Sequence, residues 1–152
     1  MARLEMDAES NLSPDQIVSA LTDFSERRLD IWPMLAPKYY KVLSVGDTTA
    51  DIQEGSVSGP IKIWARELYD WSTPGEVSFT VQESNFCTPG DYIRVELTER
   101  DGGGSRIHTT WERTGTTLIG RFVVAMIKLT RGKPLVTSMM KGLANYERIS
   151  RS

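Results

Sequence analysis

Apolar and polar residues alternate through the middle of the chain, which indicates strands. Between residues 38 and 113 the apolar positions recur at every second residue and no helical repeat is present. Pro, Gly and Asp mark the turns, and the connections are too short for the crossovers that parallel strands require. A further alternation over residues 3–8 predicts a first strand. The remaining predicted strands, all antiparallel, are Tyr39–Val45, Thr49–Ser56, Ile61–Ser72, Glu76–Glu83, Tyr92–Glu99 and Ser105–Arg113.

Two short helices are predicted between the first strand and the second. Ser13 is a favourable N-cap, Pro14 suits the first helical position, and Gln16 completes a capping box. The first helix should therefore begin at Pro14 and run for roughly three turns. A second helix over residues 26–31 is expected to turn its charged side chains outward.

The chain from residue 116 to about residue 148 is predicted to be helical. Its apolar residues recur with a spacing typical of a helix that lays one face on a core. Pro134 cannot donate to the carbonyl of Thr130, so we expect a kink or break at residues 132–134, with both halves packed on the same sheet. The expected inner stripe is Leu118, Phe122, Met126, Leu129, Val136, Met139, Leu143 and Tyr146.

This order of elements predicts an α+β fold in which a curved seven-stranded antiparallel sheet grips the long C-terminal helix. The length fits a single domain over residues 1–152. One helix cannot cover the whole apolar face of a seven-stranded sheet, and a strongly twisted sheet leaves volume beneath it. We therefore predict an apolar cavity between the sheet and the helix.

Composition and charge exclude several classes of function. A formal net charge of −2 and a pI near 5.5 give no overall attraction to nucleic acid. The chain begins without the apolar segment of a signal peptide, and its longest apolar run, Phe122–Ile127, is far too short to cross a bilayer. A cytoplasmic protein is the resulting expectation.

The chain has a single cysteine, Cys87, and a single histidine, His108. These counts rule out an intrachain disulfide and metal centres built from several histidines or several cysteines. We therefore expect no metal and no cofactor.

The strand at residues 61–72 leaves open which polar residue faces the cavity. If one face points inward, Glu67 enters the cavity beside Tyr69 and suits ligand recognition or proton transfer. If a bulge shifts the register, Arg66 takes that place and favours an anionic head group. Alternatively, both residues belong to an exposed ladder of Arg–Glu pairs across neighbouring strands. Alternation in the last strand places His108 outside.

We expect the cavity to be lined by aromatic and aliphatic side chains together with a few polar groups. The tryptophans fit either cavity walls or ordinary core filling. The residues expected to bind a ligand are Trp32, Ile63, Glu67, Tyr69, Trp71, Phe79, Val95, Trp111, Phe122 and Met126.

The order of several short motifs resembles the START/polyketide cyclase/birch-allergen-like (SRPBCC) superfamily, which has the helix-grip fold. The motifs are Ser13-Pro14-Asp15-Gln16-Ile17-Val18, Leu21-Thr22-Asp23-Phe24, Trp32-Pro33, Trp64-Ala65-Arg66, Tyr69-Asp70-Trp71, Pro74-Gly75, Gly102-Gly103-Gly104-Ser105-Arg106 and Gly120-Arg121. The middle ones are similar to bacterial polyketide cyclase/dehydrase-like members. The resemblance covers nearly the whole chain and implies a pocket for lipids, polyketides, sterols or other apolar molecules. It carries over no catalytic residues, because the superfamily shares none.

Three functions follow as expectations. The first is binding of a hydrophobic small molecule in the cavity. The second is a cyclase or dehydratase, which requires that at least two of Glu67, Tyr69, Arg66 and Tyr92 converge in one enclosed pocket. The third is a protein-interaction module with a vestigial pocket and an exposed apolar patch around Val123, Val124 and Ile127, off the inner stripe of the helix. A homodimer is left open.

Overall fold

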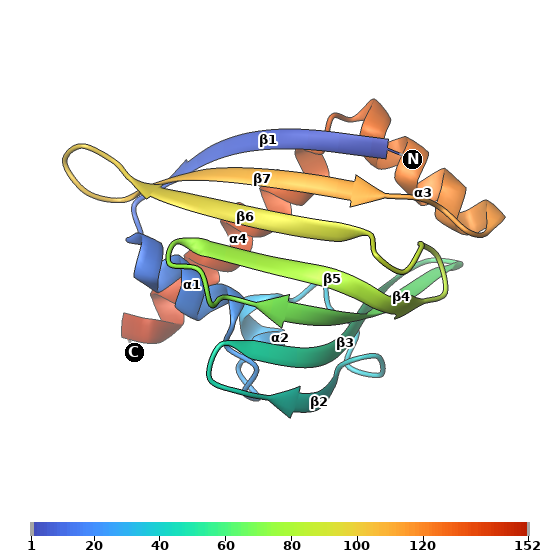
Figure 1. Cartoon of the computed structure of the whole chain (residues 1–152), viewed down its shortest axis with the longest axis horizontal. Helices are drawn as coiled ribbons and strands as arrows, with labels where there is room; N and C mark the ends of the chain where they lie inside the picture. Colours follow the sequence, from blue (N-terminus) through green and yellow to red (C-terminus); the bar gives the residue numbers. More distant parts are fainter. Residues whose placement is uncertain (1, 152) are drawn as a thin grey trace.

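Seven strands pair in one antiparallel sheet in the computed structural model, which describes residues 2–151 (Figure 1). Their order across the sheet is β1-β7-β6-β5-β4-β3-β2, so β1 and β2 form its two edges. The predicted class and topology are confirmed. The strands are β1 (Ala2–Ser10), β2 (Lys41–Val45), β3 (Thr49–Ser58), β4 (Ile61–Asp70), β5 (Glu76–Ser84), β6 (Tyr92–Glu99) and β7 (Ser105–Arg113).

Two short helices follow β1, as the sequence predicts. Helix α1 (Pro14–Leu21) begins with the complete capping box: the Gln16 amide donates to Ser13 Oγ at 3.2 Å, and the Ser13 amide donates to Gln16 Oε1 at 2.8 Å. Helix α2 (Arg28–Ile31) differs from expectation in one respect. Its Arg28 is buried rather than turned outward, because a carboxylate of the sheet lies opposite it.

The C-terminal helical region consists of two helices, α3 (Leu118–Leu129) and α4 (Lys133–Arg151). Figure 1 shows α4 crossing one face of the sheet while α3 lies beside the β1 edge. The break falls at residues 130–132, overlapping the expected 132–134 at Gly132, and its main cause is different. Arg131 and Gly132 adopt φ values of 55° and 76°, which end α3 before Pro134 is reached. Pro134 then occupies the second position of α4, where a missing N–H costs no hydrogen bond.

The predicted inner stripe is wrong for α3. Leu118 is 83% exposed and Leu129 is 76% exposed, while Gly120 and Val124 face the core instead. Close packing fixes this orientation, because a Cβ at Gly120 would overlap the carbonyl of Phe86. Phe122 and Met126 point outward with the leucines.

In α4 the predicted stripe corresponds better to the packing. Leu143 is buried, and Met139 and Tyr146 pack against the main core between the sheet and α1. Gly142 allows the close approach, since a Cβ there would overlap the ring of Trp32. No helix among residues 2–151 combines the length and the apolar character that a membrane crossing needs.

Candidate functional site

A cavity of about 330 Å³ lies between the sheet and α4. This volume falls at the lower end of the range for small-molecule sites. Most of its wall is apolar, with Ile63 and Phe79 contributed by the sheet and Leu135, Val136 and Met139 by α4. Several charged side chains also line it, so the wall combines a large apolar part with a smaller charged part.

The structure brings six of the ten predicted ligand-binding residues together around this cavity. These six are Trp32, Ile63, Glu67, Tyr69, Phe79 and Trp111. They lie on α2's C-terminal cap, β4, β5 and β7.

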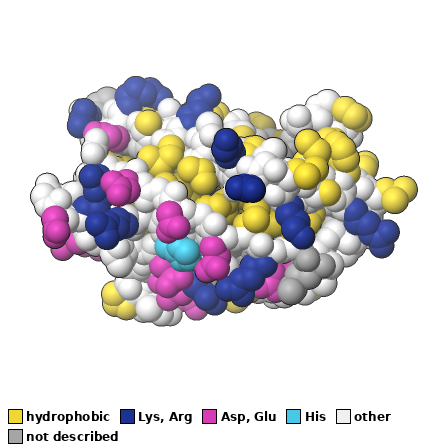
Figure 2. Space-filling view, turned by 90° about the horizontal axis from the view of Figure 1, so that it is seen from above, with side chains coloured by type: hydrophobic (Ala, Val, Ile, Leu, Met, Phe, Trp, Pro, Cys, Tyr) yellow, Lys and Arg dark blue, Asp and Glu magenta, His cyan; other side chains and the backbone are white. Residues whose placement is uncertain are grey.

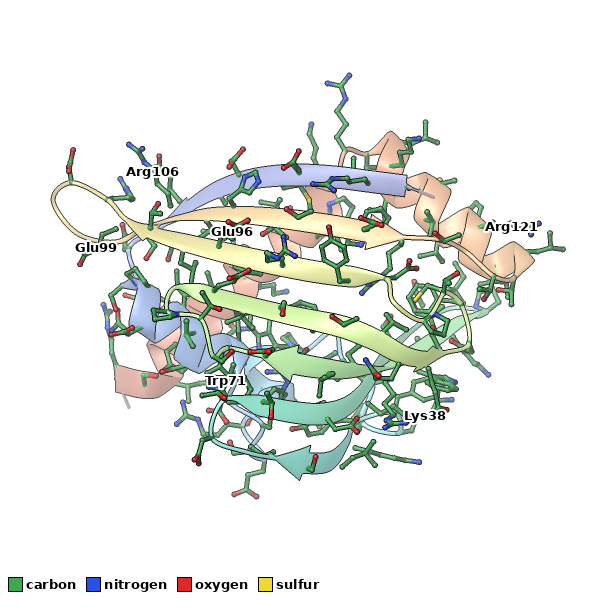
Figure 3. All side chains as sticks on the ribbon, viewed as in Figure 1. Lys38, Trp71, Glu96, Glu99, Arg106 and Arg121 are labelled. Atoms are coloured by element: carbon green, nitrogen blue, oxygen red, sulfur yellow. The ribbon has the colours of Figure 1, made fainter. Side chains whose placement is uncertain are left out.

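The other four predicted residues lie elsewhere, and the prediction is corrected for each. Val95 points inward but is fully buried within the main core. Trp71 lies past the end of β4 and packs on Phe24, with ring centroids 6.2 Å apart (Figure 3). Phe122 and Met126 lie on the outer side of α3, because Gly120 and Val124 take the inner side.

One buried polar cluster joins α2 to β3 and β4. The Arg28 guanidinium donates to Glu54 through Nε at 2.7 Å and through Nη2 at 3.3 Å, and its Nη2 also donates to the Tyr69 hydroxyl at 3.0 Å. Nη1 donates to the carbonyl of Leu21 at 2.8 Å. The Tyr69 hydroxyl in turn donates to Glu54. Every nitrogen of Arg28 therefore has a partner, as a buried charge requires.

Aromatic rings enclose this first cluster. Tyr69 stacks on Phe79 with ring centroids 4.7 Å apart, and Phe24 meets Tyr69 edge-on at 4.9 Å. The Arg28 guanidinium lies 4.6 Å from the centre of the Phe24 ring. Burial and the neighbouring Glu54 carboxylate raise the pKa of the Tyr69 phenol well above its ordinary value. Tyr69 therefore stays protonated and serves as a hydrogen-bond donor.

A second buried pair, between Glu67 of β4 and Arg113 of β7, lies on the same wall. Arg113 Nη2 donates to Glu67 Oε2 at 3.2 Å, and the two side chains, Arg113 and Glu67, are 6% and 9% exposed. Arg113 Nη1 is buried and has no hydrogen-bond partner among residues 2–151. A buried donor without a partner carries a free-energy cost, so this nitrogen of a cavity-lining residue needs an explanation.

Glu67 has an unusual acidity for a carboxyl group. Burial raises its pKa to about 7, the Arg113 guanidinium opposes this shift, and the Glu54 carboxylate adds to it. A carboxyl group with this pKa exchanges its proton near neutral pH, which suits either pH-dependent recognition or acid–base chemistry.

The alternatives for Arg66 and Glu67 are resolved by the register of β4. Glu67 points into the cavity, although a bulge separates the two residues in the pairing with β5. Arg66 lies on the opposite face, where it donates to Asp51 at 2.9 Å and to Glu83 at 2.8 Å. The exposed ladder of ion pairs that was one of the alternatives therefore exists. Of Arg66 and Glu67, only Arg66 belongs to it.

Three charged residues of the site were missed from the sequence. Glu54 and Arg113 lie at inward positions of their strands, two residues beyond Ile52 and Trp111, so strand alternation does contain their signal. Arg28 carries no comparable signal, because a four-residue helix has too few positions to define a face. Among residues 2–151, no three His, Cys, Asp or Glu side chains gather as a metal site would require.

Comparisons with known proteins identify the fold. No protein-family model and no curated protein sequence matches the chain. Among solved structures, TTHA0849 from Thermus thermophilus matches with a TM-score of 0.78 and 14% identity, covering 99% of this chain and 100% of that one. The ZhuI aromatase/cyclase from Streptomyces sp. R1128 matches with a TM-score of 0.78 and 13% identity, covering 99% and 96%.

A START superfamily protein from Mycobacterium smegmatis also matches, with a TM-score of 0.71 and 12% identity over 97% of this chain and 98% of that one. The chain therefore has the START-like, helix-grip fold, and the resemblance found in the sequence is confirmed at the level of the fold. At these identities the likeness defines architecture and leaves function to the residues of the site.

Proposed function

We propose that the cavity binds a small apolar molecule whose single acidic or carbonyl group is held by Arg113. The observation that carries this proposal is that Arg113 lines the cavity while its Nη1, a buried atom, has no hydrogen-bond partner among residues 2–151. A ligand oxygen at this position supplies the missing acceptor. The apolar part of the molecule packs against Phe79, Trp111 and Met139.

The charge state of Glu67 supports the choice of an oxygen-bearing group. When Glu67 is protonated, the positive charge of Arg113 is no longer neutralised and attracts an anionic ligand. When Glu67 is ionised, its carboxylate competes with such a ligand for Arg113. Affinity for an anionic apolar ligand should therefore rise as pH falls through about 7.

Two fluorescent probes of the same ring system test this proposal. Anilinonaphthalene sulfonate carries a negative charge, and phenylnaphthylamine has the same two aromatic groups without it. Arg113→Met should weaken binding of the sulfonate by about tenfold or more, the value of a hydrogen bond to a charged group. Binding of phenylnaphthylamine should be unchanged. Arg66→Met, a variant at an arginine on the opposite face of the sheet, is the matched control and should change neither affinity.

Either of two results contradicts the proposal: wild-type protein that binds neither probe, or an Arg113→Met variant that loses both probes equally. Native mass spectrometry of the purified protein, followed by extraction and identification of any retained apolar molecule, then defines the ligand class. Retained molecules without an oxygen function would also contradict the role of Arg113.

A second candidate function is proton transfer next to a ligand carbonyl. Two of the four residues on which an enzyme was expected to depend, Glu67 and Tyr69, line one cavity, whereas Arg66 and Tyr92 do not. In this reaction the Glu67 carboxylate takes the proton from the carbon beside the carbonyl, and Arg113 Nη1 donates to the resulting enolate oxygen. Exchange of that proton for deuterium in a small apolar β-diketone, followed by NMR, should depend on Glu67. Equal exchange rates in wild type and Glu67→Gln would remove this candidate.

A further inference from the structure

Helix α3 presents an apolar face to solvent. Its exposed side chains follow one another at helical spacing along a single side: Leu118, Ile119, Phe122, Met126 and Leu129. The opposite side of the helix, at Val124 and Ile127, packs against Trp111 and Met6. The protein thus covers one apolar side of α3 and leaves another one uncovered. Large exposed apolar surfaces of this kind mark sites of interaction.

The same part of the chain is strongly basic. Residues 114–146 contain no Asp or Glu, so this stretch has a formal charge of +5 and the rest of the chain −7. All five basic side chains of the stretch are exposed, and none forms an ion pair with residues 2–151. These side chains are Arg121, Lys128, Arg131, Lys133 and Lys141.

The figures show how the two kinds of side chain are arranged. Arg121 extends from α3 away from the sheet (Figure 3). In the view of Figure 2, hydrophobic and basic side chains intermingle on the half of the surface where α3 lies. Acidic side chains gather mainly around the single histidine, away from α3. A helix with leucine and phenylalanine flanked by Lys and Arg has the composition of a segment that lies in the interface of an anionic bilayer.

A second copy of the chain fits this face less well. A symmetric dimer through α3 would bring Arg121 and Lys128 of both copies together without any acidic residue of residues 114–146 to neutralise them. An anionic lipid surface supplies both complements at once, with hydrocarbon for the leucines and phosphate for the cations.

Both ends of α3 are fixed to residues that line the cavity. Gly120, near its start, packs on the backbone of Phe86, and Gly132, just past its end, packs on Met6. Phe86 and Met6 both line the cavity. A binding partner in contact with α3 would therefore be separated from the cavity by one layer of side chains.

We propose that α3 docks this protein on anionic lipid bilayers, with its Leu118–Leu129 side chains inserted at the level of the head groups. The proposal does not depend on what the cavity binds. Attraction of basic side chains to an anionic surface corresponds to about a fivefold change in partitioning for each Lys or Arg. Two such residues should therefore account for more than a tenfold change.

Vesicle flotation tests the proposal with the full chain. Wild-type protein should float with phosphatidylcholine vesicles that contain about 30% phosphatidylglycerol, and much less with pure phosphatidylcholine. Raising the salt to about 0.5 M should release it, because screening removes the electrostatic contribution. Arg121→Gln/Lys128→Gln and Phe122→Ser/Leu129→Ser should each reduce partitioning more than tenfold.

The control variant replaces exposed apolar residues at the other edge of the sheet. Leu43 and Val45 of β2 are about half exposed, and β2 is the edge strand farthest from β1. Leu43→Ser/Val45→Ser should float as wild type does. Circular dichroism of all variants confirms that each is folded.

Three results would overturn the proposal. The first is wild-type protein that stays unbound to anionic vesicles at low salt. The second is a Leu43→Ser/Val45→Ser variant that loses binding as fully as the α3 variants do. The third is a wild-type dimer in size-exclusion chromatography with light scattering that Phe122→Ser/Leu129→Ser converts to a monomer, without vesicle binding by wild type. That outcome would assign α3 to self-association instead.

Discussion

Both faces of β4 carry ion pairs between arginine and carboxylate side chains, but the pairs of one face are exposed and those of the other are buried. Arg66 points outward and pairs with Asp51 and Glu83, where water surrounds all three side chains in part. Glu67, its neighbour, points inward and pairs with Arg113 inside the protein. Outside, the pairs gain little because solvent already stabilises each charge. Inside, each charge depends on its partner, because little solvent reaches it.

The two inner arginines also differ from each other. Arg28 has partners at all three of its nitrogens, including both oxygens of Glu54. Arg113 makes one hydrogen bond to Glu67 and keeps Nη1 free of protein partners among residues 2–151. Arg28 is thus fully satisfied within the protein, whereas the proposed function assigns the unsatisfied nitrogen of Arg113 to a ligand. The following changes test this distinction.

Loss of Arg28 should have the largest effect. Arg28→Met leaves Glu54 buried without its counter-ion and should lower the free energy of unfolding by about 3–5 kcal/mol. Urea denaturation monitored by circular dichroism measures this change. Arg28→Met/Glu54→Leu should recover much of the loss, because it removes the stranded charge as well. A single variant as stable as wild type would mean that the pair contributes no more than an exposed one.

The pH dependence of stability should reveal Glu67. Its pKa is raised from 4.5 to about 7, so between these values the folded protein binds one more proton than the unfolded chain. The free energy of unfolding should therefore fall as pH rises from about 4.5 to about 7, by about 3 kcal/mol at most. Glu67→Gln should flatten this part of the profile, measured by urea denaturation across the pH range. An unchanged slope in the variant would assign the effect to other groups.

Loss of Arg113 should have a smaller and pH-dependent effect. Near pH 5 Glu67 is protonated, and Arg113→Met removes little more than one hydrogen bond, worth about 1 kcal/mol. Near pH 8 Glu67 loses its counter-ion, and the cost should rise to about 3 kcal/mol, the lower end of the range for a broken buried pair. Thermal unfolding at the two pH values provides the comparison. Equal losses at both would argue against the coupling of Arg113 to Glu67.

Loss of Arg66 should have the smallest effect. Arg66→Met breaks two ion pairs on the outer face, and the midpoint of urea denaturation should stay close to that of wild type. The small change that remains should vanish at high salt. A loss as large as that of Arg28→Met would erase the contrast between the two faces of β4.

The sequence predicts the strands and turns well, because each strand covers enough residues for alternation to define its two faces. Alternation in β4 left Glu67 and Arg66 as alternatives for the inner face, and the structure shows that Glu67 lies inside. Extending the inward set of β7 by two residues beyond Trp111 would have placed Arg113 there too. It could not show that Arg113 Nη1 lacks a partner, since that depends on the separation of β4 and β7 in space.

The orientation of α3 was beyond the reach of the sequence for a different reason. This helix is apolar around most of its circumference, and only Arg121 and Lys128 interrupt it. Two stripes therefore compete for the core, and the packing of Gly120 on Phe86 decides between them. Arg28 was likewise misjudged, because its burial depends on Glu54, a residue of a distant strand.

The tryptophans give the cavity a spectroscopic property of its own. Three of the four in the chain, Trp32, Trp64 and Trp111, line its wall. Their emission depends on the polarity and quenching groups around the indole, so a molecule that enters displaces or shields what these rings now contact. Occupancy can thus be followed in the unlabelled protein, in real time and at submicromolar concentration, by the colour and lifetime of its intrinsic fluorescence.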